Sequence, residues 1–204
     1  MSDRQPPDLI AIRQGKVKNL VHANLAGIDL AGAQLANADL SQANLMGAML
    51  TGANLQRAIL RANLRGADLS GADLTGADCR NADLRGANLL DAQSSQTSFA
   101  GAFLGGAILS HLDLSGADFR GADLRGATLI GARLDRADLS NANLSGADLS
   151  QADLEEATLN GAVLRGTNLT KANLLCAQVE QAVLTGATLK GACLEGTPLM
   201  PIRN

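Results

Sequence analysis

Few residues of this chain have the types and spacing that enzyme chemistry or metal binding requires. Its only two histidines, His22 and His111, lie far apart in the sequence, so no His cluster can form a zinc site or a catalytic triad. Cys79 falls at a position that we expect to be buried, where apolar surroundings suppress the thiolate. Cys176 and Cys193 are expected to stay unbonded. The sequence therefore predicts no catalytic residue, no metal and no cofactor.

The carboxylates are numerous, but their pattern is structural. Most Asp residues lie in Ala-Asp-Leu triplets that recur along the chain, as at 67–69 and 122–124. A residue that returns in repeat after repeat is typical of a solvated structural position and not of a paired general acid and base. The period of five also differs from the nine-residue repeat of calcium-binding β-helices, so we expect no calcium. The protein is predicted not to be an enzyme.

Composition narrows the class further. The chain has 204 residues, 22 of them Gly, and it has three Phe but no Trp or Tyr. Its 17 basic and 20 acidic residues give a formal charge of -3, which predicts no direct binding of nucleic acid. No segment of 18 apolar residues is present, and the first residues do not resemble a secretory signal. We expect a cytoplasmic protein that does not bind membranes.

A five-residue repeat, Ala-(Asp/Asn)-Leu-x-x, fills most of the chain. The central Leu, here called the anchor, recurs in two frames, from Leu20 to Leu60 and from Leu64 to Leu199. On an α-helix, successive anchors would lie about 140° apart and form no apolar stripe. On a straight strand they would alternate between faces. The chain must therefore bend once per repeat, and four bends of about 90° close a coil of 20 residues.

The tandem repeats, for example Ala82-Asp-Leu-Arg-Gly86 and Ala142-Asn-Leu-Ser-Gly146, resemble the pentapeptide-repeat family. The resemblance covers residues 18–201 and implies an all-β fold, a right-handed quadrilateral β-helix. The anchor and the small residue two positions before it would face inward, and the other three positions would face solvent. The number of repeats predicts about nine coils.

The two ends need caps, because an open coil exposes apolar anchors and unpaired backbone. In the N-terminal segment 1–17, Pro6 and Pro7 followed by polar and apolar residues predict a short capping helix within 8–14. Its lid over the first coil would consist of Leu9, Ile10 and Ile12. The C-terminal coil and the tail 202–204 offer little cover, and residues such as Met200 and Ile202 would be buried either by a homodimer through this coil or by an irregular cap.

The pattern breaks at two places. In 58–64 one residue is missing between anchors, which predicts either a tightened corner or a kink of the rod. At Ser94 a hydroxyl replaces an anchor, and we expect Phe99 and Leu112 to supply the missing volume. The register also predicts that Phe99 contacts Phe119 from the next coil.

Solvent-facing positions carry the candidate sites. Counting repeats in fours places a row of arginines on one side, and we predict the partner surface to consist of Arg85, Phe103, Arg125 and Arg165. The opposite side is acidic, and its candidate surface is Asp135, Asp153, Glu155 and Glu156. A third candidate is an apolar patch beside the break, formed by Met46, Met49 and Ile59. Ordinary solubility charge is the alternative to a binding surface.

The resemblance leaves two functions open. The first is a non-enzymatic scaffold or protein-protein interaction rod of the cyanobacterial type, with a regulatory role and an unidentified protein partner. The second is a DNA-mimicking protein that binds gyrase, as in the quinolone-resistance branch of the family. The small net charge, the arginine row and Leu in place of many Phe residues favour the first.

Overall fold

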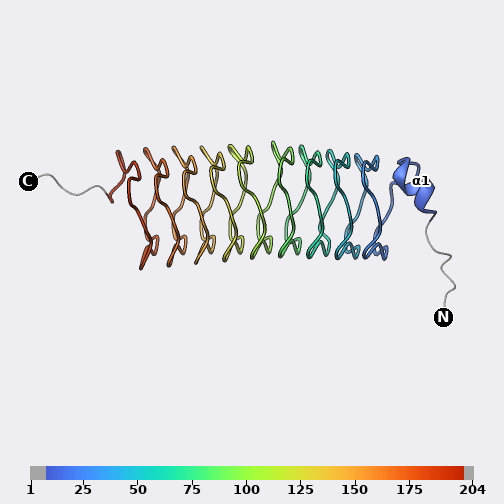
Figure 1. Ribbon diagram of the computed structural model, residues 1–204, viewed down its shortest axis with the longest axis horizontal. Coiled ribbons are helices and arrows are strands. Elements are labelled where there is room, and N and C mark those ends of the chain that lie inside the picture. The colour runs from blue at the N-terminus through green and yellow to red at the C-terminus, as the bar shows by residue number, and fades with distance from the viewer. Residues whose placement is uncertain (1–7, 200–204) are drawn as a thin grey trace, which may run out of the picture.

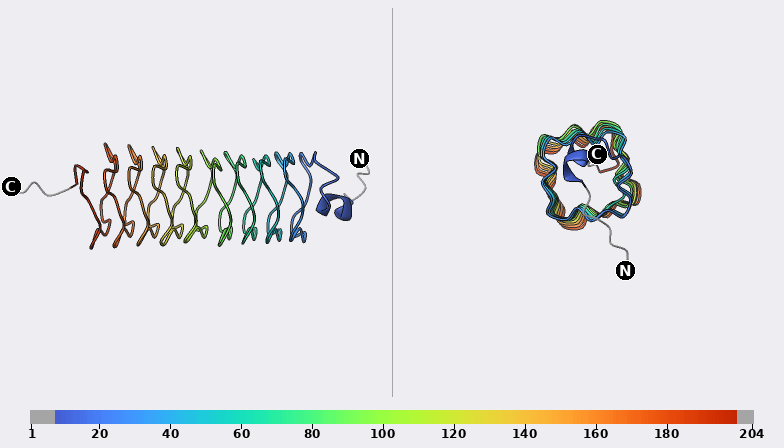
Figure 2. Two further views of the ribbon diagram at one scale, coloured as in Figure 1. Left: turned by 90° about the horizontal axis from the view of Figure 1, so that it is seen from above. Right: turned by 90° about the vertical axis from the view of Figure 1, so that its right-hand side faces the viewer.

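The computed structural model describes residues 8–199. It shows a straight rod of stacked coils with one helix at its N-terminal end (Figure 1). Seen along the axis, the coils superpose on a four-sided frame (Figure 2). The β-structure within 8–199 consists of isolated parallel bridges and contains no longer strand. The predicted quadrilateral β-helix is therefore present in outline, while its handedness and its number of coils stay predictions.

The bridges define four repeats per coil. They join residues that lie 20 positions apart, such as Asn24 with Asn44 and Val163 with Val183, because each residue meets the equivalent residue of the next coil. Two residues 20 apart are thus neighbours on one face. Two residues 10 apart lie on opposite faces.

In most repeats where Asp or Asn precedes the anchor, every backbone N–H of the repeat has an acceptor, and this explains why Asp and Asn are common at that position. In repeat 149–153, Leu149 and the residue two after it donate their N–H groups to the next coil, whereas the last residue donates to the preceding one. Ala152 closes the corner by donating to the carbonyl of Leu149 at 3.1 Å. The remaining N–H, that of Ser150, donates to the carboxylate of Asp148 at 2.9 Å. All five donors are paired, as a stable coil requires.

The interior contains the anchors and the small residues beside them. Almost every anchor Leu from Leu20 to Leu174 is buried, and so are nearly all the alanines two positions earlier. Phe99 and Phe119 stack in parallel with ring centroids 5.0 Å apart, which confirms the contact predicted from the register. Cys79 is buried on the same face, and burial, with a smaller effect of the Asp78 charge, raises the pKa of its thiol far above the usual range. We therefore expect the Cys79 thiol to be unreactive.

The N-terminal cap is a single helix, α1 (Leu9–Arg13), whose N-cap Asp8 accepts the N–H of Ala11 at 3.1 Å. Ile12 is fully buried and Leu9 is partly buried against the first coil. The prediction that Ile10 joins the lid is wrong, because Ile10 is 68% exposed. A helix of five residues presents only about one face to the coil, and Ile10 lies on the other.

The cap also continues the backbone ladder of the rod. The Arg13 carbonyl accepts the N–H of Gln34 at 2.8 Å. Gly15 passes so close to the Gln34 carbonyl that a Cβ atom would lie 2.2 Å from its oxygen. The predicted contributions of Pro6, Pro7, Met200 and Ile202 lie outside the described residues.

The ladder opens at one place, where Ser94 replaces an anchor. Within residues 8–199, the bridge expected between Gln93 and Asp113 is absent, and Figure 1 shows a wider gap between the two coils there. Leu112 in the next coil and Phe99 on the next face, the two residues expected to supply the missing volume, are both buried. The Ser94 hydroxyl donates to the Asp113 carbonyl at 3.0 Å, so the buried hydroxyl is not left unpaired. Leu112, where most repeats have Ala, thus lies in the next coil beside the point where the bridge is lost.

The missing residue in 58–64 produces a tightened corner. Ala62 donates its N–H to the Leu60 carbonyl at 2.7 Å, which closes a three-residue turn around Arg61. The bridges that span the missing residue have a spacing of 19 residues, as between Asn44 and Asn63, and the spacing is 20 on either side, as between Asn63 and Asp83. The first coils stay in line with the others, so the structure shows no kink (Figure 1).

Replacement of one anchor tests this interior. We expect Leu149→Lys to lower the free energy of unfolding by several kcal/mol, because an unpaired charge would lie among stacked leucines. The neighbouring Ser150→Ala, on the outer surface, should cost less than about 0.5 kcal/mol. Urea unfolding monitored by circular dichroism measures both. Equal stability losses for the two variants would contradict the assignment of inward and outward positions.

Candidate interaction surface

The predicted basic row lies along one edge of the rod. We call this row the arginine edge, and each member is the first residue after an anchor of the same face: Arg65, Arg85, Arg125 and Arg165. The row is interrupted by Gly105 and Ser145, which occupy the equivalent corners of their coils. The coil register of four repeats, or 20 residues, brings these side chains to one side although they are up to 100 positions apart in the sequence.

Phe103 lies beside the middle of the arginine edge. Its side chain is on the outer surface, and the residue is 47% exposed. It forms bridges to Asp83 in the coil before and to Asp123 in the coil after. The guanidinium carbon of Arg85 lies 5.9 Å from the centre of the Phe103 ring, within the range of a cation–π contact. The structure therefore brings together Arg85 and Phe103, two of the predicted surface residues.

Most arginines of this region are paired with an Asp two positions earlier, a feature that the sequence analysis missed. Arg85 Nε donates to Asp83 at 2.7 Å, and Arg125 Nε donates to Asp123 at 2.8 Å. Arg80 with Asp78 and Arg120 with Asp118 repeat this geometry. The Asp-x-Arg spacing was the available signal, because it places the guanidinium beside the carboxylate that already caps the corner. These pairs lower the net charge of the edge while keeping its guanidinium groups ordered.

The ion pairs also change the acidity of the aspartates. The arginine hydrogen bond is the main influence that lowers the pKa of Asp83 and Asp123, although partial burial opposes it. The Asp78 carboxylate accepts hydrogen bonds from two arginines, from Arg80 Nε at 2.8 Å and from Arg61 Nε at 2.9 Å. These bonds hold the pKa of Asp78 well below its usual range, although partial burial opposes them. These carboxylates stay ionised at neutral pH.

Arg165 differs from Arg85 and Arg125. It is exposed, and among residues 8–199 it has no ion-pair partner, because Val163 occupies the place of the Asp. The C-terminal end of the arginine edge thus presents a guanidinium group that is available to a partner.

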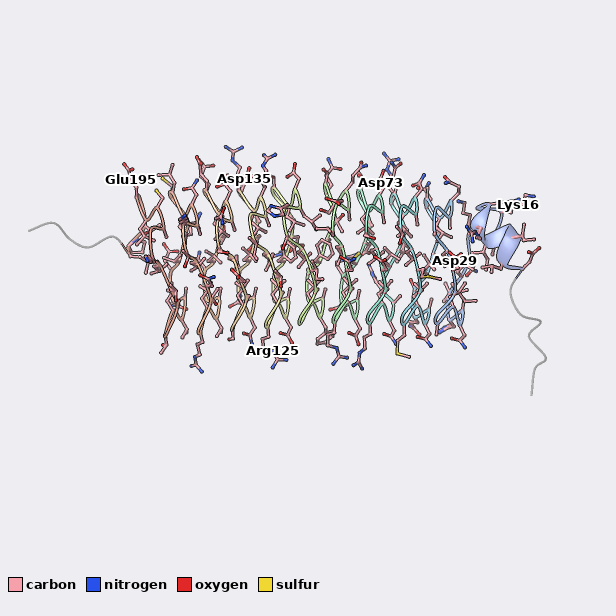
Figure 3. The ribbon with its side chains drawn as sticks, in the orientation of Figure 1. Lys16, Asp29, Asp73, Arg125, Asp135 and Glu195 are labelled. Atoms are coloured by element: carbon pink, nitrogen blue, oxygen red, sulfur yellow. The ribbon has the colours of Figure 1, made fainter. Side chains whose placement is uncertain are left out.

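The acidic candidate surface lies on the opposite edge. Figure 3 shows Asp135 and Glu195 along one side of the rod and Arg125 on the other. Arginines interrupt the acidic edge: Arg136 Nε donates to Glu156 at 2.8 Å, and Arg133 lies 3.6 Å from Asp135.

The other two predicted members of this edge contact a neighbouring amide. Asp153 and Glu155 both accept hydrogen bonds from the side-chain amide of Asn173. The predicted electrical asymmetry of the rod is therefore present but reduced by local pairing.

The structure divides the predicted apolar patch. Met46 and Met49 are 49% and 46% exposed and lie on one corner and its adjoining face. Ile59 forms bridges to Asp39 and Asp78, 10 positions from the Met49 ladder, so it lies on the opposite face. The three residues are close in sequence, but the coil separates Ile59 from Met46 and Met49 by about half a turn.

No cluster of potential metal ligands accompanies these surfaces in the described part of the chain. Residues 8–199 contain no group of three His, Cys, Asp or Glu side chains that could hold a metal ion. Cys176 and Cys193 are exposed and unbonded. The only helix described there, α1, is far too short to cross a membrane.

The repeats and their relatives establish the family. The family described as pentapeptide repeats matches the chain in eight copies, over residues 19–61, 62–93, 95–126, 122–161, 147–186 and 162–199. This chain belongs to the pentapeptide-repeat family. Among solved structures, this pentapeptide-repeat protein is 36% identical to HetL from the cyanobacterium Nostoc sp. strain PCC 7120, a protein involved in the regulation of heterocyst differentiation. The match covers 88% of this chain and 92% of HetL, with a TM-score of 0.41.

Two further solved structures share less sequence. QnrB1, a plasmid-mediated fluoroquinolone resistance protein, is 21% identical over 88% of this chain and 84% of its own, with a TM-score of 0.43. A protein of the Arabidopsis thaliana thylakoid lumen is 25% identical over 74% of this chain and 77% of its own, with a TM-score of 0.24. The comparison with curated proteins gives no match.

The lowered pKa of Asp78 predicts how this pentapeptide-repeat protein responds to acid. A carboxylate with a depressed folded-state pKa contributes stability above its ordinary pKa of about 4, and this contribution is lost as the pH falls towards the lower folded value. Asp78→Asn keeps an oxygen acceptor for the corner but removes the charge. We expect the variant to be less stable than the parent at pH 7 and the difference to shrink by pH 2.5.

Urea midpoints at pH 7, 4 and 2.5 for both proteins measure this effect. An equal difference at pH 7 and pH 2.5 would show that the Arg61 and Arg80 contacts do not stabilise the ionised form of Asp78.

Proposed function

We propose that this pentapeptide-repeat protein is a non-enzymatic, cytoplasmic interaction rod that binds a protein partner through the arginine edge and Phe103. The observation that supports this most is the Arg85 guanidinium over the ring of Phe103, a residue that is 47% exposed. Arginine and aromatic residues are enriched among the positions that contribute most to protein-protein binding. The ordered ion pairs of Arg85 and Arg125 reduce the entropy lost on binding, since the side chains are already held in place.

The rigid geometry suits a scaffold. A right-handed rod of about nine coils presents contact groups at fixed spacing along one edge, and solvent-facing residues can vary while the interior stays constant. HetL takes part in the regulation of a cell-differentiation process, and the 36% identity supports a regulatory role of the cyanobacterial type for this chain. A homodimer through the C-terminal coil remains part of the proposal, because Leu184, Leu189 and Leu194 are only partly buried there.

The second candidate is a DNA-mimicking inhibitor of gyrase that uses the acidic edge. The favouring observation is the run of Asp153, Glu155 and Glu156 beside Asp135. A duplex-like surface needs continuous negative charge, and here Arg133 and Arg136 pair with members of the run. We therefore place the interaction rod first.

Two charge-reversal variants distinguish the candidates. One carries Arg85→Glu with Arg125→Glu, and its matched control carries Asp153→Lys with Glu155→Lys on the opposite edge. Each is used as bait in affinity capture from the native cell, with quantitative mass spectrometry, and each is added to a gyrase supercoiling assay. We expect the arginine-edge variant to capture at least tenfold less of a specific partner than the parent does, and the acidic-edge control to capture as much as the parent. We expect the parent to leave gyrase activity unchanged.

Inhibition of gyrase by the parent, relieved only in the acidic-edge variant, would replace our proposal with the DNA-mimic function. Retention of the same partners by both variants would show that neither edge is the binding surface.

A further inference from the structure

The missing residue at the corner of Arg61 creates a notch in the side of the rod. At ordinary corners two residues follow the anchor, and the next Ala donates its N–H back to the anchor carbonyl, as Ala43 does to Leu40 at 3.0 Å. Between Leu60 and Ala62 there is only Arg61. The chain therefore turns inside the line of the corners before and after it, and a recess is left at the surface.

The recess is lined by the coils on both sides. Gln42 and Asn81 are the outer corner residues of the coils before and after, and both have φ near +58°, at 58° and 57°, in the conformation of a full corner. Together with Ala62 and the amide side chain of Asn63, they line a shallow, open hollow of about 330 Å³ that extends along the face to Phe103. This volume is suited to one or two side chains, at the lower end of the range for ligand pockets.

The chemistry of the notch is mixed. Phe103 supplies an apolar wall, and its ring is held by the Arg85 guanidinium at 5.9 Å. Amide groups follow along the face, where Asn63 donates to Asn44 at 3.2 Å. Such a wall accepts another flat ring by stacking, and the amides supply hydrogen bonds at its side.

The charge around the notch is positive in a chain whose net charge is -3. Arg61 and Arg85 line the hollow, and Asp83 is the only carboxylate that lines it. Arg61 contacts Asp78, but Asp78 is already bonded by Arg80 as well, so two guanidinium groups share one carboxylate. An incoming carboxylate would restore one anion per guanidinium, and charge complementarity therefore favours an acidic group.

We propose that the notch binds a short acidic segment of a partner protein, in which a carboxylate side chain lies next to an aromatic ring. The ring stacks on Phe103, and the carboxylate accepts hydrogen bonds from Arg61 or Arg85. This inference rests on the proposed interaction function and specifies the chemistry of the partner at that surface. Binding at one such site is weak by itself, and the arginine edge adds further contacts along the rod.

The test uses the full chain and two defined peptides, acetyl-Asp-Phe-Asp-amide and acetyl-Lys-Phe-Lys-amide. Nuclear magnetic resonance of the 15N-labelled protein follows the side-chain amides of Asn63 and Asn81 and the Nε–H of Arg61 and Arg85 during titration. We expect saturable shifts with the acidic peptide at millimolar concentration and at least tenfold weaker binding of the basic peptide. Equal shifts with both peptides, or no saturable shift with the acidic one, would overturn the proposal.

One matched variant isolates the notch. Insertion of a single Gly between Arg61 and Ala62 restores the five-residue period and fills the recess, while Arg85 and Phe103 stay in place. The insertion should abolish the saturable shifts, and a far-ultraviolet spectrum and melting curve like those of the parent show that the rod is intact. Phe103→Ala provides a second variant that removes the stacking wall without changing the backbone.

The proposal for the notch and the proposed interaction function can be contradicted by different results. Full peptide binding by the insertion variant would contradict the notch, whatever happens to the cellular partner. If the insertion abolishes peptide binding but the variant still captures the partner that requires Arg85 and Arg125, the arginine edge binds that partner without the notch, and the inference about the partner's chemistry is wrong. We expect the insertion variant to lose both peptide binding and capture of the cellular partner.

Discussion

The rest of the structure depends on the hydrogen bonds between coils, which require every fourth repeat to return to the same position. In a repeat such as 149–153, where Asp or Asn precedes the anchor, all five backbone donors are paired: two with the next coil, one with the previous coil, one across the corner and one with the Asp or Asn side chain. Such pairing leaves an interior just wide enough for one Leu and one Ala per side. The sequence is repetitive because each repeat must meet the same backbone and volume requirements.

This register also determines the surface. Residues 20 positions apart become neighbours, so a corner that carries Arg in several coils forms the arginine edge, and Phe103 is placed between Asp83 and Asp123. At the corners of Arg85 and Arg125, the capping Asp is held beside the arginine two positions later, which lowers the charge of the edge without removing its guanidinium groups. Where the register changes, at Arg61, the same requirement produces a notch. The candidate surfaces of this rod are therefore defined by the residues that occupy equivalent corners.

Much of the fold was predictable because the period of five excludes a regular helix or strand, and the coil register correctly predicted the contact between Phe99 and Phe119. Details that depend on the direction of individual side chains could not be predicted from the sequence. Ile10 faces solvent because a one-turn helix covers a coil with a single face, and Ile59 is separated from Met49 by half a coil. The notch could not be foreseen, since a deletion in sequence does not reveal whether the chain kinks or turns inward.

The central claim is that residues 20 positions apart are adjacent, whereas residues 10 apart lie on opposite faces. Electron paramagnetic resonance of doubly nitroxide-labelled protein tests it most directly, with Cys176 and Cys193 first replaced by Ser so that only the engineered sites are labelled. Labels at Asn143 and Val163 lie on adjacent coils, about 5 Å apart along the axis, and should show strong dipolar broadening. Labels at Asn143 and Asp153 should show little dipolar broadening, because these residues lie on opposite faces. Equal broadening in the two pairs, or stronger broadening in the second, would contradict the account.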